Sequence, residues 1–157
     1  MEAFLAAQQQ RSLSGNVVRV ISNRPSAAGL QTAKAHGIPT AIVDHTLFDS
    51  RESFDEALAN VVAEDQPDAV VLAGFMRILT PIFINRFAGK LLNIHPSLLP
   101  KYPGLNTHKR AIENGDSEAG ATVHYVTNEL DGGPPILQVR VPIRQNDTEV
   151  TLAARIL

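Results

Sequence analysis

The sequence predicts an α/β fold, with a doubly wound and mostly parallel sheet that ends in an antiparallel hairpin. Two observations predict this class. Short apolar runs alternate with helix-patterned segments through most of the chain, and the last third holds two strand-like runs joined by a Gly-Gly turn. The length of 157 residues is that of one ordinary domain, so we expect residues 1–157 to form a single domain.

The strands are predicted from short runs that are rich in apolar and β-branched residues. The run 69–73 is apolar throughout, which is typical of a parallel strand covered on both faces. The last two runs flank the turn sequence Asp131-Gly132-Gly133-Pro134, which favours antiparallel pairing. The predicted strands are 17–22, 40–43, 69–73, 91–94, 121–127 and 136–141.

The helices are predicted from apolar residues that recur every three to four positions. The clearest helix begins at Asp49 and Glu52, which resemble a capping box, and ends before Pro67. Gly37 and Gly115 stop two others. These two helices are predicted at 27–36 and 107–114, and a further helix is predicted at 81–87. A helical segment is also predicted at each end of the chain.

Both ends of the sequence fall inside predicted helices. Met1, Phe4 and Leu5 have helical spacing with no N-cap before them. The helix that begins at the capping box Asn146–Glu149 has no C-cap after it. A parallel α/β fold also normally begins with a strand. We therefore expect a chain that is cut at both ends and lacks the first, central strand of its sheet.

The composition excludes several classes of protein. Hydrophobic residues make up 44% and charged residues 19%, which excludes a disordered chain, and a net charge of −2 with scattered Lys and Arg argues against a nucleic-acid partner. The absence of cysteine excludes disulfides and thiolate nucleophiles. No apolar run approaches the roughly 20 residues that span a bilayer, and the N-terminus does not have the pattern of a signal peptide. We expect a soluble, cytoplasmic domain without a membrane partner; the oligomeric state stays open.

The first candidate for chemistry is the pair Asn93 and His95. The two residues are two apart at the end of a predicted strand, so they share a face while Ile94 is expected to point into the core. Ligands of open α/β sheets bind at the carboxyl ends of strands. A histidine can move a proton near neutral pH and an amide can stabilise an oxyanion. The alternative is a strand-end histidine that only bonds locally.

The second candidate is Asp131, which precedes two glycines. These glycines allow a tight loop that could hold the carboxylate beside a histidine, where it would stabilise the protonated ring and make that ring a general acid. The alternative is strong, because Asp-Gly is a common hairpin turn without any function.

Other patterns point less clearly to a site. The segment 74–79 after a buried strand either lines an apolar pocket or is a packed turn. His124 lies on an alternating strand face, where a satisfied and partly buried histidine is the favoured interpretation. Five histidines have no close ligand spacing, so no metal is expected, and the usual dinucleotide and phosphate-binding glycine motifs are absent.

Three segments together resemble the phosphoribosylglycinamide formyltransferase family, folate-dependent enzymes of purine synthesis. The resemblance covers nearly the whole chain and rests above all on residues 93–104, 120–127 and 129–134, with 73–79. It implies that the substrates are glycinamide ribonucleotide and 10-formyltetrahydrofolate. It also implies a catalytic trio of Asn93 for the oxyanion, His95 for proton transfer and Asp131 to orient His95. The residues implied for the folate site are Arg51, Met76, Arg77, Ile78, Leu79, Asn93, Thr127, Asn128, Glu129, Leu130 and Asp131.

Relatives of that family are the main alternatives. Formyltetrahydrofolate hydrolases share the trio but differ after the histidine and usually carry a further N-terminal domain. Methionyl-tRNA formyltransferases need an RNA-binding domain and a basic surface. A non-catalytic folate-binding remnant is the alternative of another class.

The sequence departs from the family pattern at both ends. The first strand and the phosphate-binding loop precede Met1 in the family, and a substrate-contacting segment follows Leu157. We therefore expect the 157 residues alone to lack formyl transfer, through loss of the phosphate-binding loop, while part of the folate site survives.

Overall fold

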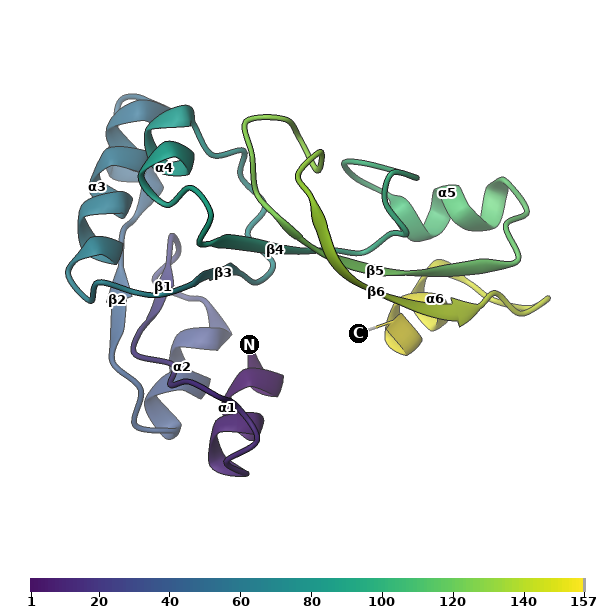
Figure 1. Cartoon of the computed structure of the whole chain (residues 1–157), viewed down its shortest axis with the longest axis horizontal. Helices are drawn as coiled ribbons and strands as arrows, with labels where there is room; N and C mark the ends of the chain where they lie inside the picture. Colours follow the sequence, from purple (N-terminus) through teal and green to yellow (C-terminus); the bar gives the residue numbers. More distant parts are fainter. Residues whose placement is uncertain (157) are drawn as a thin grey trace. The chain divides into compact units, whose positions relative to one another are not determined.

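The computed structural model describes residues 1–156, which form two compact units. One unit consists of Met1–Asp68 and Leu79–Arg86, and the other of residues 69–78 and 87–156. The strands form two sheets (Figure 1), one of two strands in the first unit and one of four strands in the second. The expectation of one doubly wound sheet is therefore wrong for the described residues, and the single domain and the absent central strand stay predictions.

The first unit is built on a small parallel sheet. The strand β1 (Val20–Ser22) pairs with β2 (Thr40–Ile42), and the helix α2 (Ala28–Ala35) connects them, as the alternating pattern predicts. The helix α1 (Glu2–Gln9) closes the core, because its buried Leu5 packs with Ala33 and Ile38. The remaining elements of this unit are η1 (His45–Leu47), α3 (Arg51–Ala63) and α4 (Pro81–Arg86).

The helix α3 begins one residue later than the predicted capping box. Ser50 is the N-cap, its hydroxyl accepts from the Ser53 N–H, and the Ser53 hydroxyl accepts from the Ser50 N–H, so Asp49 and Glu52 do not form the box. Serine caps a helix as well as aspartate does, and only the backbone geometry decides which of two neighbours takes the position. The apolar face of α3 is buried as its periodicity predicts.

The second unit contains the four-stranded sheet in the order β3-β4-β5-β6. Only β3 and β4 are parallel, whereas β4–β5 and β5–β6 are antiparallel, so this sheet is not mostly parallel. The reason is the position of α5, which lies beyond the carboxyl end of β4 (Figure 1), so that β5 starts there and runs back along β4. The elements are β3 (Val70–Leu72), β4 (Leu91–His95), α5 (Thr107–Glu113), β5 (Glu118–Tyr125), β6 (Pro135–Pro142) and α6 (Glu149–Ile156).

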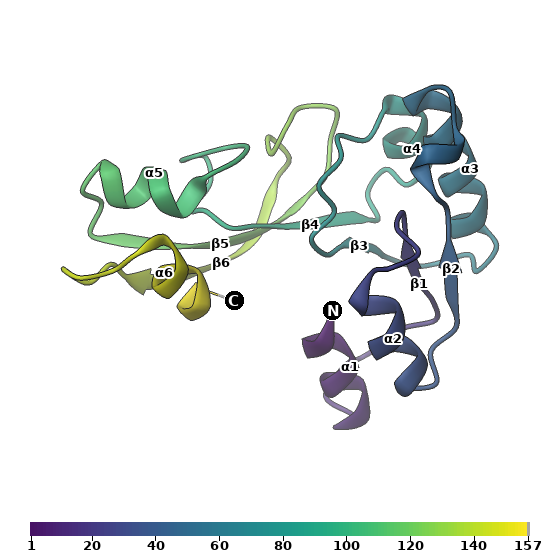
Figure 2. The same ribbon diagram turned by 180° about the vertical axis from the view of Figure 1, so that it is seen from behind.

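The β5–β6 hairpin confirms the antiparallel pairing predicted from the Gly-Gly turn. Its far end is packed by α5 and α6, and α6 lies along β6 when seen from behind (Figure 2). The buried core there contains Ala111, Ala119 and Leu152. The N-terminus of α6 is capped reciprocally by Thr148 and Thr151 rather than by the predicted pair Asn146 and Glu149.

Ile94 does not point into the core, contrary to the prediction. Its side chain is 38% exposed, whereas His95 is 5% exposed. The alternation along β4 is as predicted, but the segment after β4 folds back over the polar face of the strand. That segment contacts His95 through Tyr102, and it contacts Thr122 through Ser97. The polar face is therefore the covered one, and Ile94 lies on the other.

Candidate active site

Four side chains share one face of β4 and β5. The antiparallel register places Asn93 opposite His124, and His95 opposite Thr122. Because side chains alternate along a strand, residues paired in this way project to the same side of the sheet. His95, Thr122 and His124 are buried, and Asn93 is half-buried. The end of β4 therefore presents an amide that a substrate can reach beside histidines that are shielded from solvent.

Both ring nitrogens of His95 face oxygen acceptors. Nε2 lies 2.9 Å from the carbonyl oxygen of Tyr102. Nδ1 lies 3.3 Å from Oδ2 of Asp131, and the two side chains are only 7% and 9% exposed. A carbonyl and a carboxylate can both be satisfied only when both ring nitrogens carry hydrogen. The imidazole is thus held in one orientation between these two acceptors.

Asp131 is held in place by the backbone of two loops. It has a left-handed conformation with φ +51° in the loop between β5 and β6, and its Oδ2 accepts the N–H of Gly104 at 2.8 Å. The second glycine after it is required by close packing, because a Cβ on Gly133 would lie 1.8 Å from the carbonyl oxygen of Tyr125. The Gly-Gly sequence therefore does more than form a turn: it lets the loop close tightly over β5.

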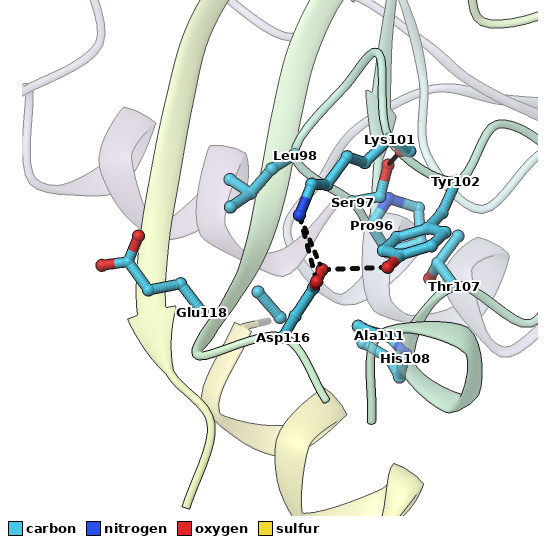
Figure 3. A pocket seen from close by; sticks show the side chains of 11 residues that line it. Pro96, Ser97, Leu98, Lys101, Tyr102, Thr107, His108, Ala111, Asp116 and Glu118 are labelled. Atoms are coloured by element: carbon cyan, nitrogen blue, oxygen red, sulfur yellow. Dashed lines mark hydrogen bonds and ion pairs between the residues drawn. The ribbon is translucent and has the colours of Figure 1, made fainter. Parts of the chain in front are cut away.

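The segment 96–104 is itself fixed from behind by a polar network (Figure 3). Lys101 Nζ and the Tyr102 hydroxyl both bond to the carboxylate of Asp116, at 3.0 Å each. The hydrogen bond from Lys101 is the main cause that lowers the pKa of Asp116. Ser97 Oγ donates to the carbonyl of Lys101 at 2.6 Å. This network lines the pocket shown in Figure 3. Asn93, His95 and Asp131 do not line that pocket, so the pocket is not the predicted catalytic site.

His124 is a site neighbour that the sequence interpretation missed. It is 2% exposed, and its Nε2 lies 3.3 Å from Nδ2 of Asn93. The same Nε2 lies 3.8 Å from Oδ1 of Asp131. His124 thus contacts two of the three predicted catalytic residues. The alternation along the strand predicts that Thr122 and His124 share a face. Only the pairing of β5 with β4 shows that this face also carries Asn93 and His95.

The residues predicted for the folate site are spread over both units. Thr127, Asn128, Glu129 and Leu130 are exposed and lie in the same loop as Asp131. Met76 and Ile78 are exposed at 79% and 62% in the segment after β3. Arg77 is half-buried in that segment, whereas Arg51 and Leu79 belong to the first unit. Their part in a folate site stays a prediction.

Residues 1–156 hold neither a cluster of metal ligands nor a membrane-spanning helix. No group of three or more His, Asp or Glu side chains in that range has the arrangement of a metal site. No helix there combines the length and the apolar character needed to span a bilayer. The polar groups that the structure brings together at the end of β4 are an amide, two imidazole rings and a carboxylate.

The family model described as formyl transferase matches residues 1–157, and the chain belongs to this family. The chain is 51% identical over 156 residues to phosphoribosylglycinamide formyltransferase of Escherichia coli (strain K12), covering 99% of this chain and 74% of that one. Within the formyl transferases it therefore belongs to the phosphoribosylglycinamide formyltransferases.

Two further relatives differ in length and support the same assignment. The human trifunctional purine biosynthetic protein adenosine-3 is 43% identical over 156 residues, which are 99% of this chain and 15% of that protein. The crystal structure of glycinamide ribonucleotide transformylase 1 from Symbiobacterium toebii matches with a TM-score of 0.96 at 41% identity, covering 99% of this chain and 73% of that one. The α/β fold with parallel and antiparallel strands is thus a formyltransferase fold.

Proposed function

We propose that the site described above serves the transfer of a formyl group from 10-formyltetrahydrofolate to the amine of 5-phosphoribosylglycinamide, in purine biosynthesis in the cytoplasm. The observation that carries the proposal is the contact of 3.3 Å between His95 and Asp131, beside Asn93 at the end of β4. Two of the relatives named above are, by name, a phosphoribosylglycinamide formyltransferase and a glycinamide ribonucleotide transformylase, and the formyl-folate donor follows from the family. No metal is needed for the step.

The first half of the reaction forms the new bond. The amine nitrogen attacks the formyl carbon, and the carbonyl oxygen becomes negatively charged in the tetrahedral intermediate. Asn93 is half-buried and can donate an amide N–H to that oxygen. A preorganised donor of this kind typically contributes about 3 kcal/mol. Protonated His95, next to Asn93 on the same face, adds a positive charge that stabilises the same intermediate.

The second half breaks the old bond. The attacking nitrogen loses a proton, the bond between the carbon and N10 of the folate breaks, and N10 gains a proton, so the products are the formylated amine and tetrahydrofolate. His95 is the group that can relay this proton, and general acid–base catalysis of this kind contributes about 10²–10⁴ in rate. Asp131 keeps the ring charged and oriented while it does so, because its own position is fixed by Gly104.

The test follows both products. The 157-residue chain and an extended version, completed with the additional segments of the Escherichia coli relative, are incubated with 10-formyltetrahydrofolate and glycinamide ribonucleotide. Formylated ribonucleotide and tetrahydrofolate in equal amounts from the extended version support the proposal. Free formate in place of the formylated product would indicate a hydrolase, and binding of a folate analogue without turnover would indicate a folate-binding protein.

The same assay tests the activity of the 157 residues by themselves. The inactivity expected of the 157 residues alone stays a prediction. A turnover equal to that of the extended version would show that the described residues suffice.

A further inference from the structure

We propose that His124 is a positioning residue for Asn93: in its neutral form, protonated on Nδ1, it accepts an N–H from the Asn93 amide and fixes the direction of that amide. The inference rests on the proposed function, because it concerns the oxyanion donor of that reaction. It goes beyond it by adding a fourth side chain with a defined hydrogen-bonding state.

The tautomer of His124 is set by the adjacent backbone. Its Nδ1 lies 2.9 Å from the backbone carbonyl oxygen of Tyr125, which can only accept a hydrogen bond. Nδ1 must therefore carry the hydrogen. In the neutral ring the other nitrogen, Nε2, then has a lone pair and can accept a hydrogen bond. The side chain is only 2% exposed, so this lone pair is shielded from solvent.

Asn93 faces the other nitrogen of this ring. Its amide group lies 3.3 Å from Nε2 of His124, and a lone pair there requires an N–H donor opposite. The Asn93 amide must then turn its NH₂ group, and not its oxygen, towards His124. One of the two amide hydrogens is bound in this way, and the second remains to donate to a developing oxyanion. With the opposite orientation, Asn93 would present its oxygen where a donor is needed.

Asp131 lies near both histidines. Its Oδ1 lies 3.8 Å from Nε2 of His124, and its Oδ2 lies 3.3 Å from Nδ1 of His95. A hydrogen on Nε2 of His124 would pair with this carboxylate and compete with His95 for it. It would also face the NH₂ group of Asn93. The neutral Nδ1–H tautomer therefore serves both functions, because it leaves Asp131 to His95 and orients Asn93.

Two substitutions test the hydrogen bonds of the two ring nitrogens separately. His124→Gln keeps an acceptor near the position of Nε2, whereas His124→Asn keeps a donor near Nδ1 and loses that acceptor. In the extended version we expect His124→Gln to retain kcat within about 3-fold, and His124→Asn to lower kcat roughly 10- to 100-fold, because the oxyanion donor is misdirected. Folate-analogue affinity and the thermal unfolding midpoint should be similar in the two variants.

A spectroscopic measurement tests the inference without turnover. Long-range ¹H–¹⁵N NMR spectra of the 157-residue chain, labelled at histidine and held in mildly alkaline buffer, distinguish a protonated from an unprotonated ring nitrogen. The His124→Phe variant assigns the signals. We expect Nδ1 protonated and Nε2 unprotonated in His124. Nε2 protonated would overturn the inference even if formyl transfer is confirmed, and equal kcat values for the Gln and Asn variants would overturn it as well. If formyl transfer itself fails, the NMR result still decides the orientation of Asn93.

Discussion

His95 and Asp131 lie with a ring nitrogen and a carboxylate oxygen 3.3 Å apart, although one ends a β-strand and the other lies in a hairpin loop. The contact depends on two loops at once. The segment after β4 supplies the carbonyl of Tyr102 to the ring and the N–H of Gly104 to the carboxylate. The site is thus assembled by backbone groups of the segment 96–104, which Lys101 and Tyr102 tie to Asp116.

Replacing Asp131 by Asn should remove the carboxylate charge that faces Nδ1 of His95 while keeping the size of the side chain. We expect kcat of the extended version to fall on the order of 10²-fold, with folate-analogue binding largely retained. Steady-state kinetics and analogue titration measure the two quantities. Glu118→Gln is the matched control, since this exposed carboxylate pairs with Arg140 away from the site. An unchanged kcat in Asp131→Asn would remove Asp131 from the mechanism.

Replacing Gly133 by Ala should displace the loop that carries Asp131. A Cβ at this position would lie 1.8 Å from the Tyr125 carbonyl oxygen, so the backbone of the hairpin must move. We expect a loss of about 1–3 kcal/mol in the free energy of unfolding, measured by urea denaturation. Gly15→Ala is the control, because nothing lies within 4 Å of its added Cβ. Equal stability of the two variants would contradict the packing described.

Replacing Thr122 by Val should loosen the segment 96–104. The Thr122 hydroxyl, in a residue that is 0% exposed, donates to the Ser97 carbonyl and accepts from the N–H of Leu99 and from Gln138. Valine has the same shape but leaves these partners unsatisfied, at a cost of about 1–3 kcal/mol. Urea denaturation measures the loss. Thr127→Val, in the exposed loop, is the control, and a comparable effect there would argue against a special role for Thr122.

Acid should weaken the same segment through Asp116. Its pKa lies below the ordinary value of 3.8, first because Lys101 donates to it, so the folded protein binds a proton there less readily than the unfolded chain. The resulting stability is present above the ordinary value and is lost as pH falls through the lowered one. We expect Asp116→Asn to flatten the decline of unfolding free energy below about pH 4. Urea denaturation at several pH values measures this, with Glu118→Gln as the control that should retain the wild-type slope.

Much of the site could be predicted from local sequence. The two-residue spacing of Asn93 and His95 places them on one strand face, and two glycines after Asp131 allow a sharp loop. Which face of β4 is covered could not be predicted, because that depends on the segment 96–104 folding back over the strand. The prediction that Ile94 points into the core is therefore wrong.

The direction of β5 relative to β4 could not be predicted from local sequence either. The parallel pairings of β1–β2 and β3–β4 follow from strand–helix alternation, but β4 and β5 are also separated by a helix and are antiparallel. The difference lies in where α5 packs, which is a tertiary property. The same pairing brings His124 to Asn93, so the contact between them could not be predicted before the register was known.

The central claim is that His95 carries the proton chemistry of formyl transfer, and the most direct measurement is single-turnover formyl transfer by His95→Ala in the extended version. At saturating substrates we predict a rate lower by about 10²-fold or more, with the affinity for a folate analogue unchanged. A single-turnover rate close to that of the unsubstituted enzyme would contradict the account.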